Sequence, residues 1–244
     1  MVKSRISYRG EVFMKVVILA AGIGSRLDGS HDHIPKALTR LANHKSILQY
    51  QLDALACHLS LNQVIVVVGY HKEQIMAAFP DLMYVFNPLY AQENTAKSLL
   101  RAFKKIEEDV LWLNGDVVFH PSILKPLLDA DRTAMIVNRT GVGEEEVKYR
   151  TDGKERILEV SKQVKLGEGE ALGINFFKKE DLSLLKENLE RCQPKDYFEK
   201  GIEQGIQQGQ IVWTSLIDAK ECAEIDFPED LVRANQLLEQ WQLI

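Results

Sequence analysis

Cysteine is scarce in this sequence. Its 244 residues include three cysteines, Cys57, Cys192 and Cys222, and no two of them form a Cys-x-x-Cys pair. An odd number of widely spaced thiols argues against a disulfide framework and is typical of reduced, mostly buried cysteines in the cytosol. We therefore expect a cytoplasmic protein.

Long apolar segments and an excess of basic charge are missing as well. No apolar run reaches the roughly 20 residues that a membrane-spanning helix needs, and residues 1–13 lack the apolar centre of a signal peptide. The net charge is −5, so no overall basic field would attract nucleic acid. We expect no membrane insertion and no nucleic-acid partner. Residues 1–13 would be a frayed extension, and residues 14–244 would form a single domain with a full core.

The most informative stretch begins with an apolar run at residues 16–19 and ends at Lys36, reading VVILAAGIGSRLDGSHDHIPK. A continuous apolar run is typical of a buried parallel strand. After it, small residues followed by Gly22 and Gly24 would let the backbone pass close to an anion with its N–H groups exposed. The Arg26 guanidinium would add donors for phosphate oxygens. The stretch therefore predicts a phosphate-binding loop.

Two common phosphate loops do not fit this stretch. A dinucleotide-binding loop would have a third glycine where Leu27 stands and an acidic residue at the end of the next strand, but the next apolar strand begins only near Val64. An ATPase loop would end in Gly-Lys-Ser or Gly-Lys-Thr, which is also missing. The sequence contains instead Gly-x-Gly-x-Arg followed, after a polar segment, by Pro35 and Lys36.

Strands and helices alternate through the first half of the chain. Its apolar periodicity predicts strands at 63–68, 83–86 and 110–113 and helices at 46–59, 72–79 and 95–106. This alternation predicts a parallel sheet with helices on both faces and ligands at the carboxyl ends of the strands.

After Pro121 the pattern changes to short strands separated by turns. The second half is predicted to contain strands at 134–138, 147–150, 157–161, 172–177 and 211–217, and helices at 181–191, 196–206 and 228–241. We interpret residues 14–120 as a nucleotide-binding half and residues 121–244 as an added half with a mixed sheet.

Two carboxylates are candidates for metal binding. Asp116 follows the last strand of the first half, at the predicted ligand edge of the sheet, and strand-like alternation places Glu224 and Asp226 on one face. Carboxylate oxygens held against phosphate are ligands that Mg²⁺ prefers. We expect Asp116 and Asp226 to bind Mg²⁺; taken alone, either residue would equally fit an ordinary turn or helix cap.

The LAAG sequence before Gly-x-Gly-x-Arg, together with Pro35 and Lys36, resembles the signature of nucleotidyltransferases that join an NTP to a phosphorylated sugar or alcohol. The resemblance covers most of the chain from Met14, and residues 224–226 are similar to the second acidic motif of the family. It implies a nucleotide-diphospho-sugar transferase-like α/β fold, in which a Rossmann-like, mostly parallel mixed sheet is flanked by helices and a small mixed-sheet lid binds the acceptor. It also implies Mg²⁺ as the cofactor.

The acceptor half departs from the sugar-specific members of this family. Lys162 resembles the family lysine that binds the acceptor phosphate, but Ser161 precedes it where sugar-specific relatives usually have glutamate. Residues 146–149 and 170–173 look more like the small cytidylyltransferases that use phosphocholine. The resemblance therefore implies transfer of CMP from CTP, or of a nucleotidyl group from another NTP, to a small phosphorylated acceptor, with release of pyrophosphate.

Two alternatives stay open: a sugar-1-phosphate uridylyl- or thymidylyltransferase, and a catalytically inactive nucleotide-binding regulatory subunit. The sequence does not reveal the oligomeric state.

Nucleotidyl transfer is an in-line displacement by an oxygen that is already anionic, so the reaction requires no general base. The lack of a convincing Ser-His-Asp or Cys-His set is consistent with such a reaction.

The predicted site residues fall into three groups beside the two metal ligands. The catalytic residues are Arg26, Lys36 and Lys162. The nucleotide-binding residues are Leu19, Ala20, Ala21, Gly22, Gly24, Ser25, Asn94, Thr95 and Ser98, of which Asn94 would otherwise be a helix cap. The acceptor-binding residues, each of which would otherwise belong to the core or the surface, are Trp112, Tyr149, Glu170, Gly173, Tyr197 and Asp218.

Overall fold

The computed structural model describes residues 14–24, 27, 34–139, 143 and 146–243. The extension expected at residues 1–13 and the predicted site residues Ser25 and Arg26 lie outside the described residues. Among the helices that the structure describes, none is long and apolar enough to cross a membrane.

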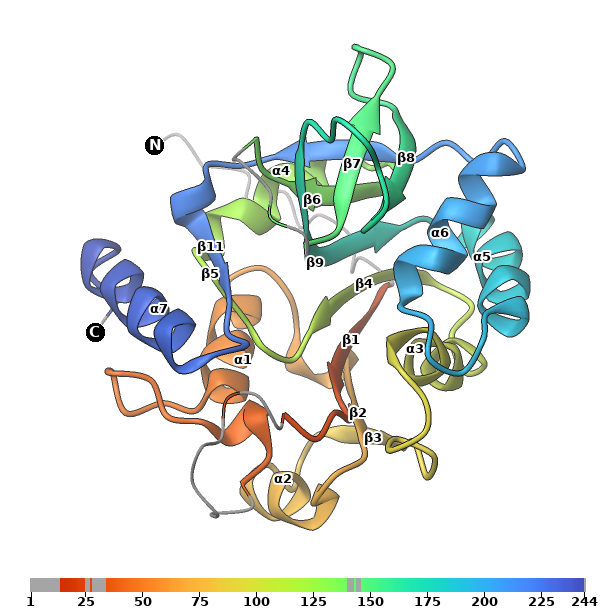
Figure 1. Cartoon of the computed structure of the whole chain (residues 1–244). Helices are drawn as coiled ribbons and strands as arrows, with labels where there is room; N and C mark the ends of the chain where they lie inside the picture. The colour runs from red at the N-terminus through yellow and green to blue at the C-terminus, as the bar shows by residue number, and fades with distance from the viewer. Residues whose placement is uncertain (1–13, 25–26, 28–33, 140–142, 144–145, 244) are drawn as a thin grey trace, which may run out of the picture.

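The described strands form one large mixed sheet and one small ribbon (Figure 1). The large sheet has the order β10-β6-β9-β4-β1-β2-β3, and β7 and β8 are attached beside β9. Its strands are β1 (Met14–Ala20), β2 (Val64–Val68), β3 (Met83–Phe86), β4 (Asp109–Asn114), β6 (Ala134–Val137), β7 (Lys148–Thr151), β8 (Ile157–Ser161), β9 (Gly169–Phe177) and β10 (Trp213–Leu216). The ribbon pairs β5 (Val117–Phe119) with β11 (Cys222–Glu224) in antiparallel fashion.

The nucleotide-binding half supplies the parallel part of the large sheet. β1 runs parallel to its neighbours β2 and β4, and β3 continues the sheet beyond β2. β9 runs in the opposite direction between β4 and β6, which makes the sheet mixed. Because Leu19 near the end of β1 is in register with Asn114 at the end of β4, the loops after these two strands meet at one edge of the sheet.

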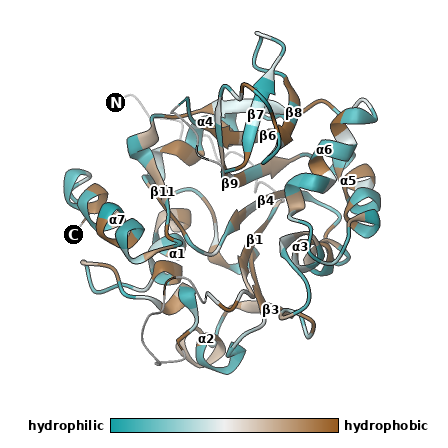
Figure 2. Ribbon diagram, viewed as in Figure 1, coloured by the Kyte–Doolittle hydropathy of each residue, from teal (hydrophilic) through white to brown (hydrophobic). Residues whose placement is uncertain are grey.

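Helices cover both faces of the sheet because successive strand residues point to opposite sides. The described α-helices are α1 (Ile47–Ala56), α2 (Lys72–Ala78), α3 (Thr95–Phe103), α4 (Leu124–Asp129), α5 (Lys179–Arg191), α6 (Phe198–Gln207) and α7 (Pro228–Gln240). One face is covered by α3, α5 and α6, and the other by α1, α2 and α4, whereas α7 packs on the β5–β11 ribbon and α1. Figure 2 shows hydrophobic residues concentrated on the central strands and hydrophilic residues on the outer sides of the helices.

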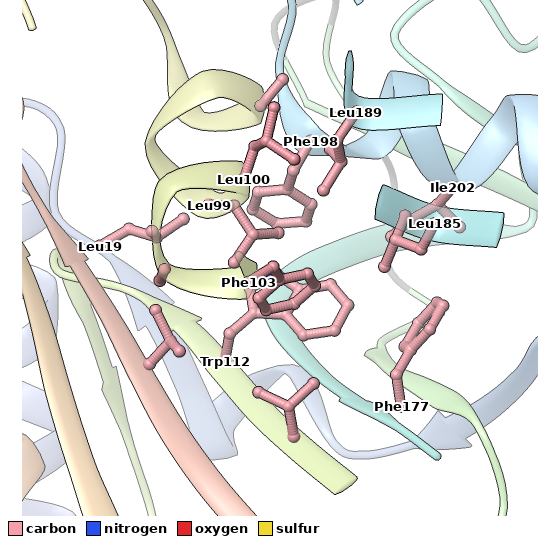
Figure 3. Close-up of a cluster of buried hydrophobic side chains, with 14 of the residues drawn as sticks. Leu19, Leu99, Leu100, Phe103, Trp112, Phe177, Leu185, Leu189, Phe198 and Ile202 are labelled. Carbon is pink, nitrogen blue, oxygen red and sulfur yellow. The ribbon is translucent and has the colours of Figure 1, made fainter. Parts of the chain in front are cut away.

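An aromatic cluster fills the space between the sheet and the α3, α5 and α6 helices (Figure 3). At its centre the side chain of Trp112 is fully buried. Its ring centroid lies 5.4 Å from that of Phe103, 4.9 Å from that of Phe177 and 5.7 Å from that of Phe198. The expectation that Trp112 binds the acceptor is therefore wrong, because neighbouring side chains enclose the ring completely.

The expected α/β fold class and most of the predicted elements are confirmed. The predicted helix at residues 46–59 forms α1, and Ser46 caps it, since Ser46 Oγ accepts a hydrogen bond of 3.1 Å from the Gln49 N–H. The sequence analysis missed β5, α4 and most of β11. These elements are three to six residues long, which is too short to show a period.

The buried position of Trp112 leads to a prediction about stability. Replacing Trp112 with alanine would remove the centre of the aromatic cluster and leave a cavity, so we expect the free energy of unfolding to fall by about 3–5 kcal/mol. Leu216→Ala is the control because the Leu216 side chain is exposed, and it should change stability by about 0.5 kcal/mol or less. Urea denaturation measures both values. A Trp112→Ala variant as stable as the parent protein would contradict this account of the core.

Candidate functional site

A cleft of about 540 Å³ opens where the loops after β1 and β4 meet. Both halves of the chain line it. One wall comes from the loop after β1, the start of α3 and the end of β4. The other comes from β9, the start of α6 and the segment that joins β11 to α7. The cleft therefore lies at the edge of the sheet where the sequence predicted a ligand.

Lys36 connects three distant segments inside the cleft. Its Nζ atom lies 2.8 Å from Asp116 Oδ2 and 2.6 Å from Asp226 Oδ1. Burial on its own lowers the pKa of Lys36, but the charges and hydrogen bonds of Asp116 and Asp226 outweigh this effect, so the net pKa is raised. The ammonium group is therefore a stable cation at physiological pH, and the structure brings together three residues that the sequence singled out.

Asp116 is held in place by a tight turn between β4 and β5. The Gly115 N–H donates a 2.9 Å hydrogen bond to Leu19 O at the end of β1. A Cβ atom at position 115 would lie only 2.5 Å from the same oxygen, so this approach requires glycine. The amide of the buried Gln51 on α1 donates to the carbonyl oxygens of Asn114 and Val117, at 2.9 Å each, and closes the turn. The position of Asp116 thus follows from β1, β4 and α1 together.

Asp226 lies at the entry to α7. The Ile225 N–H donates a 3.0 Å hydrogen bond to Asp116 O, which extends the β5–β11 pairing up to the site. The carboxylate of Asp230, in the first turn of α7, accepts hydrogen bonds from the backbone N–H groups of Asp226 (3.0 Å) and Phe227 (2.8 Å). These contacts hold Asp226 opposite Asp116 with Lys36 between them.

The carboxylates of the cleft suit a hard divalent cation. Asp116 Oδ1 is buried and has no hydrogen-bond partner within the described part of the chain. Glu224 lies close by and accepts a 3.2 Å hydrogen bond from Asn114 Nδ2; burial, together with the charges of Asp116 and Asp226, raises its pKa to about 8. No three His, Cys, Asp or Glu side chains among the described residues form a complete metal site. Two carboxylates completed by substrate phosphate oxygens are a typical arrangement for Mg²⁺.

The loop after β1 lies against Lys36. Leu19, Ala20, Gly22 and Gly24 line the cleft as predicted. Gly24 has φ +68°, and a Cβ there would lie 2.8 Å from Lys36 Cβ, so a larger residue would displace Lys36. This loop could present its N–H groups to a phosphate as the sequence analysis expected.

Of the other predicted nucleotide-binding residues, some line the cleft and some do not. Asn94 and Thr95 line the cleft at the start of α3, and Asn94 is also the helix cap, since its Oδ1 accepts a 2.8 Å hydrogen bond from the Thr95 N–H. Ala21 is not part of the lining; its carbonyl oxygen accepts a hydrogen bond from the Tyr70 N–H. The prediction for Ser98 is wrong because its hydroxyl is buried and accepts a hydrogen bond from Asn87 Nδ2.

The acceptor half brings Lys162, Glu170, Gly173 and Tyr197 to the cleft, as predicted. Lys162 Nζ lies 4.8 Å from the centroid of the Tyr197 ring, a cation–π contact. Burial raises the pKa of Glu170, although the hydrogen bond that its carboxylate accepts from Asn138 Nδ2 partly offsets the effect. This part of the cleft therefore contains Lys162 and the largely buried carboxylate of Glu170.

Two further predicted acceptor-binding residues do not reach the cleft. The Tyr149 side chain is almost fully buried in the core, and its hydroxyl donates a 3.0 Å hydrogen bond to Asn138 O. Asp218 caps the 3-10 helix η4 (Ala219–Glu221), where its Oδ1 accepts a hydrogen bond from the Lys220 N–H. Both predictions are wrong, because the Tyr149 side chain packs in the core and the Asp218 side chain caps η4.

The structure adds carboxylates to the cleft that the predictions omitted. Glu199 is only 6% exposed, and its Oε2 atom has no hydrogen-bond partner among the described residues. Burial raises the pKa of Glu199 to about 7, and the charge of Lys162 lowers it only in part. Glu146 also lines the cleft, and its buried Oε2 has no hydrogen-bond partner within the part of the chain that the structure describes. A signal for Glu199 was present in the sequence: it interrupts the apolar side of a helix that carries Phe198 and Ile202.

Comparison with known proteins identifies the class of this site. The family model "MobA-like NTP transferase domain" matches residues 16–174, which include Lys36 and Asp116. The chain belongs to this family. The suspected membership in the nucleotidyltransferases is therefore confirmed.

Individual relatives include enzymes whose names specify CMP or cytidylyl groups. The CMP-5'-(3-aminopropyl)phosphonate synthase of Streptomyces rubellomurinus is 34% identical over 129 residues, which are 50% of this chain and 20% of that protein. The choline-phosphate cytidylyltransferase of Streptococcus pneumoniae is 40% identical over 88 residues, 35% of this chain and 38% of that protein. Bifunctional GlmU of Methanococcus maripaludis is 34% identical over 113 residues, 45% of this chain and 26% of that protein. These matches thus span well under half of each relative.

Solved structures confirm the fold. The structure of CTP:phosphocholine cytidylyltransferase (LicC) from Streptococcus pneumoniae matches with a TM-score of 0.75 at 20% identity, over 92% of this chain and 99% of that chain. The inositol-1-phosphate CTP transferase from T. maritima matches with a TM-score of 0.77 at 20% identity, over 94% of this chain and 98% of the other. The expected nucleotide-diphospho-sugar transferase-like fold is therefore confirmed.

The buried carboxyl of Glu199 leads to a prediction about pH dependence. Since its pKa is raised to about 7 in the folded protein, the folded state binds the proton more tightly than the unfolded state does, and stability falls as the pH rises from about 4.5 to above 7. Glu199→Gln removes this loss. We expect the variant to gain up to about 3 kcal/mol relative to the parent protein between pH 5 and pH 8.

Urea denaturation at both pH values measures this relative gain. Glu203→Gln is the matched control, because Glu203 lies one turn further along α6 and forms an ion pair with Lys200. It should show no such gain. A Glu199→Gln variant whose stability relative to the parent protein is the same at both pH values would show that the carboxyl titrates normally.

Proposed function

We propose that this protein is a Mg²⁺-dependent cytidylyltransferase that transfers CMP from CTP to a small phosphorylated alcohol or amine, such as a phosphocholine-like compound, and releases pyrophosphate. The observation that carries the proposal is the position of Lys36 between Asp116 and Asp226, at the end of a glycine-rich loop inside a cleft. The choice of CTP is supported by relatives whose names specify CMP or cytidylyl transfer.

The reaction that fits this arrangement is an in-line displacement. A phosphate oxygen of the acceptor attacks the α-phosphorus of CTP, a new P–O bond forms, and the bond between the α-phosphorus and its bridging oxygen to the β-phosphate breaks, so that pyrophosphate leaves. Lys36 would contact the reacting phosphates and reduce their repulsion, and Lys162 would bind the acceptor phosphate. Arg26, which lies outside the described residues, is proposed to bind the triphosphate. Catalysis would rest on positioning and on charge neutralisation.

Asp116 and Asp226 are the residues that would hold Mg²⁺. The fit rests on Asp116 Oδ1, which is buried without a hydrogen-bond partner within the described part of the chain, and on the excess of carboxylates over cations at this point. When bound, Mg²⁺ would neutralise negative charge on the phosphate oxygens of CTP.

The direct test measures pyrophosphate release from CTP with a panel of acceptors. The panel contains phosphocholine, phosphoethanolamine, 2-aminoethylphosphonate, inositol-1-phosphate, glycerol-3-phosphate and glucose-1-phosphate, each with Mg²⁺ or with EDTA. We expect release with CTP and one or more of the small alcohol or amine acceptors, and none with EDTA. UTP, dTTP, ATP and GTP are tested in parallel.

Each alternative has its own outcome in this assay. Turnover of glucose-1-phosphate with UTP or dTTP and none with CTP would overturn the proposal in favour of a sugar nucleotidyltransferase. CTP binding without pyrophosphate release for any acceptor would favour an inactive regulatory subunit.

The charged cluster gives a second prediction for the same assay. Lys36→Met should lower kcat/KM by about 100- to 1,000-fold, the effect of losing one preorganised donor to a transition-state charge. Asp116→Asn should raise the Mg²⁺ concentration that gives half-maximal rate. Lys104→Met is the control, because Lys104 is exposed and forms an ion pair with Glu190 outside the cleft. Unchanged turnover of the Asp116→Asn variant at low Mg²⁺ would contradict the assignment of the metal ligand.

A further inference from the structure

The acceptor end of the cleft contains carboxylate oxygens that nothing in the described structure satisfies. The Oε2 atoms of Glu199 and Glu146 are buried and lack a hydrogen-bond partner among the described residues, and both residues line the cleft. A buried ionised carboxylate without a partner is costly, so such a group is expected to meet a donor or a cation when the site is filled. These two oxygens therefore point to a ligand group that donates hydrogen bonds.

The neighbouring charges indicate that this ligand group is positive. Burial is the main cause that raises the pKa of Glu170; the charge of Glu146 raises it further, and the charge of Arg233, which also lines the cleft, lowers it. Lys162 is the cation whose charge acts on Glu199, and burial still raises the pKa of Glu199 to about 7 despite it. If the acceptor phosphate binds Lys162, the charge of this lysine is neutralised, and the carboxylates beside it lose their compensating cation. A positive group at the far end of the acceptor would restore the balance.

The aromatic residues of the site argue against a quaternary ammonium group. Such a cation has no N–H and is bound by aromatic rings that surround it. Trp112 and Tyr149 lie in the core, and the face of Tyr197 is already in contact with Lys162. The other aromatic residues of the described lining are Tyr90, before α3, and Phe227, before α7, so they lie in separate segments of the chain. The described lining thus offers acceptor atoms for N–H donors more readily than an aromatic cage.

We propose that the acceptor is a small phosphate or phosphonate whose other end is a protonated amine with N–H groups, and that Glu199 and Glu146 accept hydrogen bonds from this ammonium. The inference rests on the proposed function and names the acceptor class of the same site. Lys162 would bind the phosphate or phosphonate end, and Glu199 would determine specificity at the other end. Without a ligand, the buried carboxylate oxygens of Glu199 and Glu146 lack a partner among the described residues, which is costly. The ammonium would donate charge-assisted hydrogen bonds to them.

The experiment compares acceptors that differ only at this end. Initial rates with CTP are measured for phosphoethanolamine, for 2-hydroxyethyl phosphate as the neutral analogue, and for phosphocholine as the quaternary analogue. 2-Aminoethylphosphonate distinguishes a phosphonate from a phosphate source. We expect kcat/KM to be about 10- to 100-fold higher for a primary amine than for the hydroxyl analogue, the ratio expected for hydrogen bonds to a charged group.

Variants test whether Glu199 and Glu146 cause this preference. Glu199→Gln and Glu146→Gln should each lower kcat/KM for the amine, through a higher KM, by a larger factor than for 2-hydroxyethyl phosphate, so that the amine preference shrinks. Glu203→Gln, the same change on α6 outside the cleft lining, should keep the full preference. Thermal unfolding of each variant verifies that it is folded.

Binding is measured separately from turnover, so that failure of the reaction and failure of the inference can be told apart. Calorimetry with the protein saturated with the non-hydrolysable analogue CMPCPP reports the affinity of each acceptor. Amine-selective binding without pyrophosphate release would keep the inference and overturn the proposed reaction. A preference for phosphocholine or the hydroxyl analogue, or an amine preference that survives both glutamine variants, would overturn the inference.

Discussion

The pairing of Lys36 with Asp116 and Asp226 is the interaction on which the candidate site depends. These partners are 80 and 190 residues apart in the sequence, so the ion pairs form only when the loop after β1, the β4–β5 turn and the entry to α7 have all reached their final positions. A partly buried cation between two carboxylates is stable because each charge compensates the others, and removal of any one leaves a charge with incomplete solvation. The cluster of Lys36, Asp116 and Asp226 thus joins the two halves of the chain. It also contains the charged groups that would act on the phosphates in the proposed reaction.

This convergence relies on close backbone contacts that few sequences allow. Gly115 brings the β4–β5 turn against the last carbonyl groups of β1, and the β5–β11 ribbon then carries the second half of the chain back to the same edge of the sheet. α7 packs against this ribbon and against α1. This packing fixes the start of α7, and Asp226 lies directly before it. The small ribbon therefore matters more to the site than its length suggests, because it places the second carboxylate relative to the first.

The parts of the site that sequence reasoning predicted are those that belong to local motifs. The glycine-rich loop, Lys36, Asp116 and Asp226 could be found because each stands at a fixed place beside a recognisable strand or turn. Trp112 was misplaced for a physical reason: β4 is buried on both faces, so the alternation of side chains does not reveal which of them reaches the cleft. Tyr149 was misplaced because β7 is only four residues long, too short to show from the sequence which side chain enters the core. Glu199 is conspicuous in the sequence as a charge on the apolar side of α6, but only the packing of α6 and of the segment before β7 against the rest of the chain brings Glu199 and Glu146 into the cleft.

The charges of the cleft explain why its ligands should be cationic at two separate places. At the nucleotide end, Asp116, Asp226 and Glu224 lie around one lysine, and burial together with the charges of the two aspartates raises the pKa of Glu224. The excess of carboxylates suits a divalent cation that would accompany CTP in the proposed reaction. At the acceptor end, Glu146, Glu170 and Glu199 line the cleft together with Lys162, Lys195 and Arg233, and Lys162, whose charge acts on Glu199, would itself bind a phosphate or phosphonate group. A neutral or purely anionic acceptor would leave these carboxylates unpaired in a poorly hydrated space, whereas an ammonium group at the far end of the acceptor would compensate them. The charge imbalance at each end therefore favours a metal ion on one side and an amine on the other.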